Sequence, residues 1–241
     1  MYLNLNGIFF FGLQTLLIGS SYKKVNSTDA IKAFRKAIGI YLDNGRILQA
    51  AKTAKETAEI FEEDESGDSN ENIKLAVESY EQAAEFFNME NQKSQGNQCM
   101  AKVAELLSAA VEPPEFIRAA NIYDGLGKNC LESNLLKFNA KGYFLQSLLC
   151  FLASGDSIGA SQALHRYDAI DYTFGESREG KFAASLLSCV ENLDPEGFAT
   201  ACMDYDRITK LDPWKTSILV RIKRTIGGGT LDSDDNDVDL T

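Results

Sequence analysis

The chain has 241 residues, 44% of them hydrophobic, with a formal net charge of −11 and a pI of about 4.7. This length and apolar content are enough for one extended domain with a sizeable core, and the 24% of charged residues argue against a disordered or membrane-embedded chain. The negative charge disfavours nucleic acid as a partner because a polyanion is repelled at long range, although a local basic face remains possible.

The first twenty residues are apolar and carry no charge before Lys23. The stretch from 7 to 18 is too short and too interrupted for a comfortable membrane span, and residues 1–6 lack the positive start of a secretory signal. A helix docked on the first repeat, an atypical start, and a signal or anchor all remain open for residues 1–20.

One pattern dominates the rest of the chain, an alanine followed four residues later by an aromatic residue. Its copies are Ala30/Phe34, Ala76/Tyr80, Ala119/Tyr123, Ala163/Tyr167 and Ala201/Tyr205. A spacing of four places both residues on one helix face, where the small alanine lets a neighbouring helix approach the aromatic ring. Successive alanines are 46, 43, 44 and 38 residues apart, and periods of this size are typical of helical solenoids with two helices in each repeat.

Second helices are predicted between these pairs. The segments 46–61, 98–111, 135–149 and 181–190 are amphipathic at the helical period, and no segment alternates with period two. Helix starts are marked by Asp194-Pro195 and Asp212-Pro213, in which a capping side chain precedes a proline, and Pro113-Pro114 stands before Glu115 in the same manner. We therefore predict an all-α fold.

Two polar segments interrupt the predicted helices. Residues 62–72 are expected to form an acidic loop, and the C-terminus after Gly227-Gly228-Gly229 is expected to be a flexible tail. The tail contains Asp232, Asp234, Asp235, Asp237 and Asp239. The glycine triplet is not a phosphate loop, since no Gly-Lys-Ser/Thr follows it and the predicted helix precedes it.

Residues suited to metal or catalytic chemistry are sparse. The five cysteines are odd in number and form no CxxC pair, and the single histidine, His165, cannot complete a Cys/His zinc site. Buried free thiols in a reducing cytosol are expected, and His165 is expected to be a surface or hydrogen-bonded side chain. With no nucleophile elbow and no desolvated acid pair, we expect no catalytic residues, no cofactor and no metal.

From Ser21 to Thr241 the sequence resembles the soluble NSF attachment protein (SNAP) family. The segments that carry the resemblance are Tyr22-Lys23-Lys24, Asn44-Gly45-Arg46, Ala50-Ala51-Lys52, Tyr80-Glu81-Gln82-Ala83-Ala84, the run from Leu135 to Phe144, Phe174 with Ser177-Arg178-Glu179, and the run from Leu211 to Lys223 around Trp214. The acidic tail ending in Asp239-Leu240-Thr241 completes it and favours the α-type over the γ-type of the family.

The resemblance implies a tetratricopeptide-like right-handed solenoid of antiparallel helix hairpins, with a C-terminal helical bundle and a disordered acidic tail. The expected domains are a divergent apolar segment (1–20), the solenoid and bundle (21–226) and the tail (227–241). A generic tetratricopeptide scaffold that binds an extended peptide is the alternative, but it would not need the final helix around Trp214 or the tail ending in Leu240.

The resemblance also implies an adaptor that binds the SNARE four-helix bundle, recruits and stimulates the ATPase NSF, and lies at vesicle, ER-Golgi and vacuolar membranes as a peripheral protein from the cytoplasm. Syntaxin-type and related SNAREs and the membrane surface are the implied partners. Positions matching the SNARE-facing basic residues are Arg46, Lys52, Lys102, Lys137 and Lys141, while Gln98 replaces a family lysine. Positions matching the NSF side are Glu191, Asp237, Asp239 and Leu240. Lys137 and Lys141, four residues apart, are expected on one helix face.

The family has further hairpins ahead of the point where the resemblance begins, including a loop with exposed aromatic residues that touches the membrane. Residues 1–20 stand in their place, and the cluster at Phe9-Phe10-Phe11 is either a substitute membrane contact or chance apolarity. We therefore expect a shortened or divergent SNAP that keeps contact with NSF and grips SNAREs less strongly, with a non-productive truncated SNAP as the other possibility.

Overall fold

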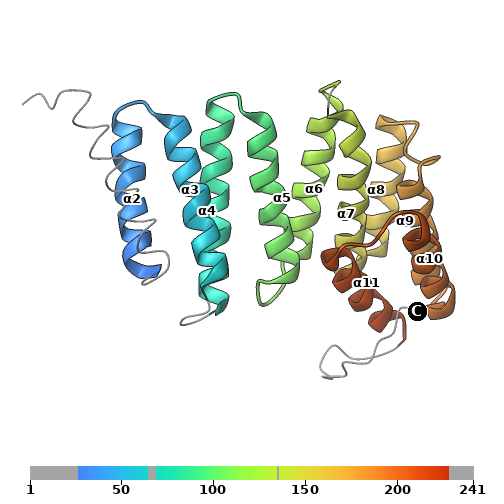
Figure 1. The fold of residues 1–241 in the computed structure, drawn as a ribbon. Coiled ribbons are helices and arrows are strands. Elements are labelled where there is room, and N and C mark those ends of the chain that lie inside the picture. Colours follow the sequence, from blue (N-terminus) through green and yellow to red (C-terminus); the bar gives the residue numbers. More distant parts are fainter. Residues whose placement is uncertain (1–26, 65–68, 135, 228–241) are drawn as a thin grey trace, which may run out of the picture. The chain divides into compact units, whose positions relative to one another are not determined.

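The computed structural model describes residues 27–64, 69–134 and 136–227, with side chains described from Ile31 onward. Within these ranges the chain forms ten α-helices and one short 3-10 helix and contains no strand (Figure 1). The predicted all-α fold is confirmed. The segment 1–20, with its Phe9-Phe10-Phe11 cluster, and the tail from 228 to 241 lie outside the described residues.

The chain divides into two compact units. Unit 1 comprises the described residues up to Leu106 together with Ala110–Pro113, and unit 2 comprises Leu107–Ala109 and the described residues from Pro114. Unit 1 contains α2 (Ser27–Asp43), α3 (Ile47–Glu63), α4 (Ser69–Met89) and most of α5 (Lys93–Ala109). Its successive helices run antiparallel, with the chain turning alternately at the two ends of the hairpins (Figure 1).

The core of unit 1 is built from the alanine–aromatic pairs. Ala76, Tyr80, Ala83 and Phe87 of α4 are all buried. On α3, the stripe that includes Ala50, Ala54 and Ala58 is also fully buried. Since alanine side chains are short, α3 and α4 approach closely, and the larger rings of the facing helix fill the remaining space.

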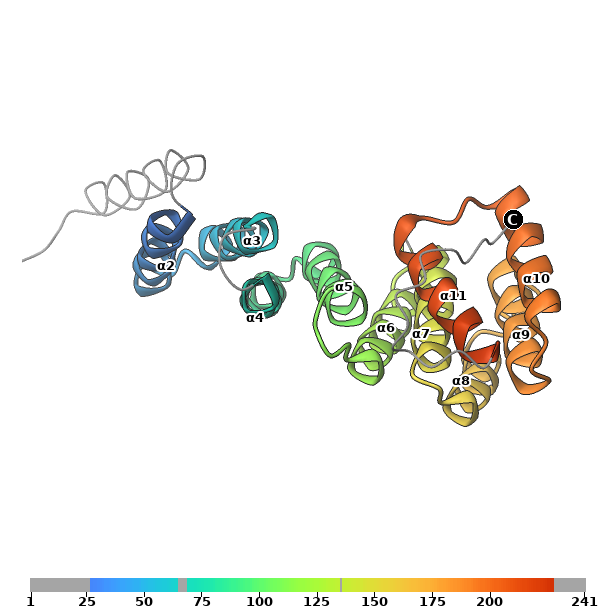
Figure 2. The same ribbon diagram turned by 90° about the horizontal axis from the view of Figure 1, so that it is seen from below.

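Unit 2 contains the remaining helices in antiparallel succession. They are α6 (Phe116–Leu131), the 3-10 helix η1 (Lys137–Asn139), α7 (Ala140–Ala153), α8 (Ser157–Ile170), α9 (Arg178–Glu191), α10 (Pro195–Ile208) and α11 (Pro213–Ile226). The helix α7 contacts α6, α8, α9 and α11 (Figure 2). Its apolar residues on nearly all sides suit this central position.

Aromatic rings and a short hydrogen-bond chain organise the core of unit 2. Phe144 of α7 stacks on Tyr167 of α8, with 4.1 Å between ring centroids, and Phe174 meets both rings edge-on. The Tyr167 hydroxyl donates to Ser147 Oγ at 2.8 Å, and Ser147 in turn donates to the Ala120 carbonyl at 2.9 Å. The polar groups are therefore satisfied inside an otherwise apolar core.

The final helix, α11, is fixed at its first turn. Asp212 caps it by accepting a hydrogen bond from the Lys215 backbone N–H at 2.8 Å, and Asp194 caps α10 through Gly197 in the same way at 2.9 Å, as the sequence predicted. The indole N–H of Trp214 donates to Ser108 Oγ at 2.9 Å, and its ring meets Tyr123 edge-on at 5.5 Å. These contacts dock α11 within unit 2.

Several boundaries differ from the sequence prediction. The helices predicted to begin at 98 and 181 begin at Lys93 and Arg178. The helix predicted over 135–149 begins only at Ala140, since Leu136, Lys137 and Asn139 make hydrogen bonds three or four residues back in a turn and a 3-10 helix. The acidic loop predicted over 62–72 is shorter, because α3 continues to Glu63 and α4 begins at Ser69. Asn72 contributes to this shortening by donating to the Asp64 carbonyl at 2.9 Å.

Candidate partner-binding surface

Three of the five predicted SNARE-facing residues belong to unit 1. Arg46 is half-buried at the N-cap of α3, and its backbone carbonyl accepts the first hydrogen bonds of that helix. Lys52 is exposed one and a half turns later on α3. Lys102 lies on α5, and its side chain is only 29% exposed.

The Lys102 ammonium is already engaged inside the protein. It lies 2.8 Å from Glu62 of α3 and 3.0 Å from Glu105, one turn later on its own helix. Burial lowers the pKa of Lys102, but its hydrogen bonds to the two carboxylates outweigh burial and raise the pKa overall. Tyr80 of α4 donates to the other Glu62 oxygen at 3.0 Å, so one carboxylate connects three helices.

A groove lies beside Lys52 on unit 1. It has a volume of about 490 Å³, and residues of α3, α4 and α5 line it, among them Leu48, Lys52, Lys55, Glu59, Phe87 and Gln95. Phe87 is buried, so the groove has an apolar floor beneath charged and amide side chains. We call this the α3 groove. Neither Arg46 nor Lys102 lines it.

The other two predicted SNARE-facing residues begin the second hairpin of unit 2. Lys137 is exposed in η1 and Lys141 is half-buried in the first turn of α7. The expectation that they share one α-helix face is wrong, because the chain changes from a 3-10 to an α-helix between them. Lys141 Nζ donates to the Thr173 carbonyl at 3.3 Å, which links the start of α7 to the turn before α9.

Exposed aromatic rings accompany these two lysines. Phe138, between them in η1, is 77% exposed and lies 5.4 Å from Lys137 Nζ. Tyr172, next to Thr173, is 88% exposed. The sequence analysis did not identify either residue as exposed. An apolar residue at a helical spacing is expected in the core, and only the local turn structure shows otherwise.

The described part of the predicted NSF side lies at the other end of α9. Glu191 is the last residue of this helix and is exposed, while Asp237, Asp239 and Leu240 lie outside the described residues. Leu193, two residues after Glu191, is 70% exposed in the acidic turn that leads to Asp194. The 14 residues of α9 separate this turn from the Thr173 turn, a distance of roughly 20 Å at the rise of an α-helix.

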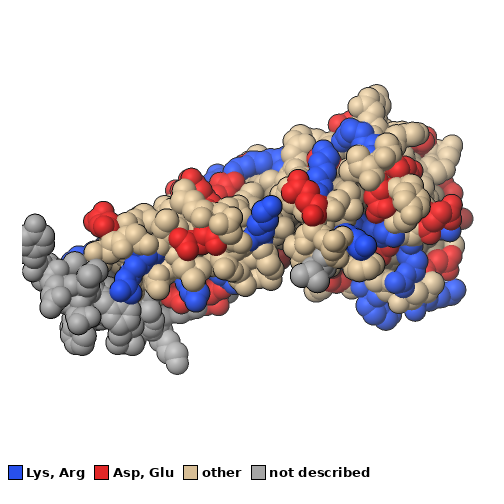
Figure 3. Space-filling view, turned by 90° about the horizontal axis from the view of Figure 1, so that it is seen from above, with Lys and Arg blue, Asp and Glu red and all other residues tan. Residues whose placement is uncertain are grey.

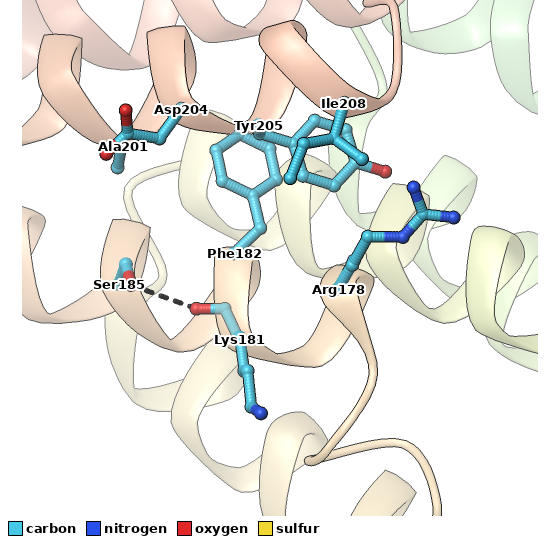
Figure 4. Close-up of a pocket in the computed structure, with 8 residues that line it drawn as sticks. All are labelled: Arg178, Lys181, Phe182, Ser185, Ala201, Asp204, Tyr205 and Ile208. Carbon is cyan, nitrogen blue, oxygen red and sulfur yellow. Dashed lines mark hydrogen bonds between the residues drawn. The ribbon is translucent and has the colours of Figure 1, made fainter.

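A second groove lies between α9 and α10, with a volume of about 240 Å³ (Figure 4). Phe182 and Tyr205 stack at 4.2 Å between centroids, and Ile208 lies beside Tyr205. The Lys181 side chain points away from α10, whereas Arg178 reaches toward it (Figure 4). Arg178 donates a hydrogen bond to Thr209 Oγ1 at 2.9 Å. This groove uses none of the predicted partner-binding residues.

Charges of both signs are interspersed over the described helices, as the face in Figure 3 shows for each unit. No group of three His, Cys, Asp or Glu residues in the described ranges is placed to hold a metal ion. His165 is exposed, and its Nδ1 lies 2.7 Å from the Ser161 carbonyl. Cys99, Cys130, Cys150 and Cys202 are buried free thiols, and Cys189 is half-buried. None of the described helices is both long and apolar enough to cross a membrane.

Comparisons with known proteins agree on one family. A family model described as soluble NSF attachment protein, SNAP, matches residues 19–227. The chain is 36% identical to an alpha-soluble NSF attachment protein of Vitis vinifera, over 90% of this chain and 72% of that protein. It is also 36% identical to the human alpha-soluble NSF attachment protein, over 87% and 68%, and to the vesicular-fusion protein SEC17 of Coprinopsis cinerea, over 86% and 68%.

Among solved structures, a Get4 crystal structure from C. therm. covers 97% of this chain and 88% of its own, at 13% identity. Its TM-score of 0.37 is too low to bear on the fold or function of this chain.

Proposed function

Because this chain belongs to the soluble NSF attachment protein family, we propose that it is an adaptor that binds SNARE complexes and recruits and stimulates the ATPase NSF for SNARE disassembly in vesicle fusion and intracellular transport. The observation that carries this proposal is the family match over residues 19–227, which takes in the helical hairpins and α11 together. In this role the protein supplies grip and stimulation and no catalytic chemistry of its own.

The SNARE-binding side of the proposal rests on the basic residues. Arg46, Lys52, Lys102, Lys137 and Lys141 are proposed to meet the acidic outer surface of a SNARE four-helix bundle, with syntaxin-type and related SNAREs as the partners. Single surface charges contribute little and are screened by salt, so binding depends on several weak attractions acting together. In unit 2, the exposed Phe138 and Tyr172 rings near Lys137 and Lys141 would add apolar contact beside these two lysines.

The NSF-binding side is proposed to comprise Glu191, Asp237, Asp239 and Leu240. Acidic residues suit basic surfaces on NSF, and Leu240 would add one apolar anchor near the end of the tail. Support comes from the opposite ends of α9. Glu191 is the last residue of this helix, and the turn at Thr173, whose carbonyl accepts a hydrogen bond from Lys141, precedes its first residue. An adaptor with two partners needs such separate surfaces.

We further propose cytoplasmic, peripheral association with vesicle, ER-Golgi and vacuolar membranes. The proposed division of the chain is a divergent segment at 1–20, the solenoid and bundle at 21–226 and an acidic tail at 227–241. In this division, contact with a membrane surface falls to residues 1–20 or to the bound SNARE complex.

The test is NSF-dependent disassembly of a purified SNARE complex. It compares the full chain, a Leu240→Ala variant and a version that starts at Ser21. We expect disassembly with the full chain, its loss in Leu240→Ala, and its retention without residues 1–20. A Val238→Ala variant, which shortens an apolar side chain in the same tail, serves as the matched control.

Each contrary result points to a different error. Full activity of Leu240→Ala would contradict the proposed NSF contact of Leu240 and leave the adaptor function intact. SNARE binding without disassembly by any version would identify a non-productive SNAP. Failure of the folded chain to bind SNARE complexes at all would overturn the proposed function.

A further inference from the structure

We propose that Lys55, a residue outside the basic set that the family resemblance assigns, is a SNARE-binding residue, and that the α3 groove receives acidic side chains of the bundle between Lys52 and Lys55. The inference rests on the proposed function and names a further residue of the same surface. It also predicts that Lys55 contributes more to binding than Lys102 does.

The first support is position. Lys52 and Lys55 are three residues apart on α3, so their side chains are neighbours on one face of that helix, and both line the α3 groove. Gln95 of α5 also lines this groove, and its amide can donate hydrogen bonds to a carboxylate. The α3 groove therefore contains two cations, an amide donor and two carboxylates beside the buried Phe87 ring.

The second support is that these two ammonium groups are available. Within the described residues, neither Lys52 nor Lys55 has a carboxylate at ion-pair distance, whereas Lys102 has two, at 2.8 and 3.0 Å. To bind an acidic partner, Lys102 must weaken contacts to Glu62 and Glu105 that already satisfy it. Lys52 and Lys55 have no such contacts to weaken.

The carboxylates on the same helix form no ion pair with either lysine in the described residues. Glu56 and Glu59 follow Lys52 and Lys55 by four residues, and a lysine that precedes its glutamate at this spacing is the weaker arrangement. Both glutamates also line the α3 groove, so the two ammonium groups must attract an acidic partner in their presence. Glu56 has a further interaction in the chain.

The third support is that Lys55 lies on the side of α3 that faces α5. Lys55 and Gln95 of α5 line the same groove. Gln98, about one turn after Gln95 on α5, is exposed and uncharged. Lys55 thus supplies a positive charge near this uncharged part of α5.

The experiment measures the Kd of the full chain for a soluble SNARE complex at low and physiological salt. We expect Lys55→Gln to raise the Kd roughly threefold and Lys55→Glu roughly tenfold at low salt, with a smaller dependence on salt than in the unchanged chain. Lys52→Glu should behave like Lys55→Glu. Lys102→Gln should raise the Kd by less than Lys55→Gln.

The matched control is Lys74→Glu, which reverses an exposed lysine of α4 that does not line the α3 groove. Lys55→Glu binding as tightly as Lys74→Glu, while Lys52→Glu is weakened, would overturn the role of Lys55 and leave the proposed function intact. A larger loss for Lys102→Gln than for Lys55→Gln, in a variant whose circular dichroism and melting temperature are unchanged, would overturn the ranking. Absence of SNARE binding by the unchanged chain would instead overturn the proposed function itself.

Discussion

The Lys102 ammonium lies 2.8 Å from one oxygen of Glu62, while the Tyr80 hydroxyl donates to the other oxygen of the same carboxylate at 3.0 Å. Both ends of the ion pair are less than one-third exposed, at 29% and 28%. A pair of this kind is less screened by solvent than a surface ion pair, and loss of one partner leaves a partly buried charge. Through its two oxygens, the Glu62 carboxylate thus links the C-terminal turn of α3 to α5 and to α4.

Glu62→Gln is expected to lower the free energy of unfolding by about 1 kcal/mol, because the amide can still accept from Tyr80 but no longer attracts Lys102. Urea denaturation followed by far-UV circular dichroism measures the change. Glu85→Gln, at an exposed position of α4, is the control and should leave the midpoint unchanged. Equal midpoints for both variants would show that the Glu62 contact adds no stability.

Alkaline pH is expected to destabilise the fold. Burial, together with the negative charge of Glu62, raises the pKa of Tyr80, and burial also raises the pKa of Tyr167. Since the pKa in the folded state exceeds the unfolded value of about 10, the folded state retains these protons above that pH, and the unfolded state loses them. The contribution of these two tyrosines to stability should therefore be constant below about pH 10 and fall above it.

Each such tyrosine contributes a loss of up to about 1.4 kcal/mol for every pH unit above its unfolded pKa. Tyr80→Phe should make the decline of stability with pH shallower, although it also removes the hydrogen bond to Glu62. Urea midpoints measured across the alkaline range, with tyrosinate absorbance followed in parallel, give the slope. An unchanged slope in Tyr80→Phe would contradict the assignment.

Gly127→Ala is expected to destabilise unit 2 by about 1–3 kcal/mol, despite the higher helix propensity of alanine. A β-carbon at this buried position of α6 would lie 2.3 Å from the Phe144 ring, which stacks on Tyr167 and cannot retreat freely. Gly125→Ala is the matched control on the same helix, where an added β-carbon meets nothing within 4 Å. This control should be neutral or stabilise by up to about 1 kcal/mol, and a loss at position 125 as large as at 127 would rule out the steric explanation.

Ser108→Ala is expected to cost about 1 kcal/mol, since it removes the hydrogen-bond acceptor of the Trp214 indole N–H. Trp214 is the single tryptophan of the chain, so its fluorescence reports on the docking of α11. The emission spectrum should shift in Ser108→Ala and remain unchanged in Ser185→Ala, a substitution at an exposed serine of α9. A spectrum in Ser108→Ala identical to that of the unchanged chain would mean that the contact does not hold the indole.

Much of the fold could be predicted because the sequence repeats a local rule. Ala76/Tyr80, Ala119/Tyr123 and Ala163/Tyr167 are buried pairs on their helices, and Asp194 and Asp212 cap the helices that they precede. Each of these features depends on residues within four positions of one another. Local spacing is therefore sufficient to identify them.

The rest depends on contacts between distant residues. The late start of α7 arises from turn hydrogen bonds that periodicity does not reveal, and Phe138 there is exposed although it matches a core spacing. The resemblance assigns roles by position, so it does not reveal the engagement of Lys102 by Glu62, forty positions earlier. Nor does it reveal that, within the described residues, Lys55 has no carboxylate at ion-pair distance. The basic residues of the candidate surface could be named from the sequence, but their relative availability requires the side-chain contacts.

The Trp214 contact also has a consequence for the order of synthesis. Within unit 2, Phe116 and Tyr123 of α6 are made early, and α11 covers them through Arg221, 4.8 Å above the Phe116 ring, and through Trp214. Because synthesis proceeds from the N-terminus, about ninety further residues must be made before α11 can pack on these rings. A nascent chain that has not yet reached α11 therefore leaves the apolar rings of Phe116 and Tyr123 without the contacts that α11 supplies in the folded protein.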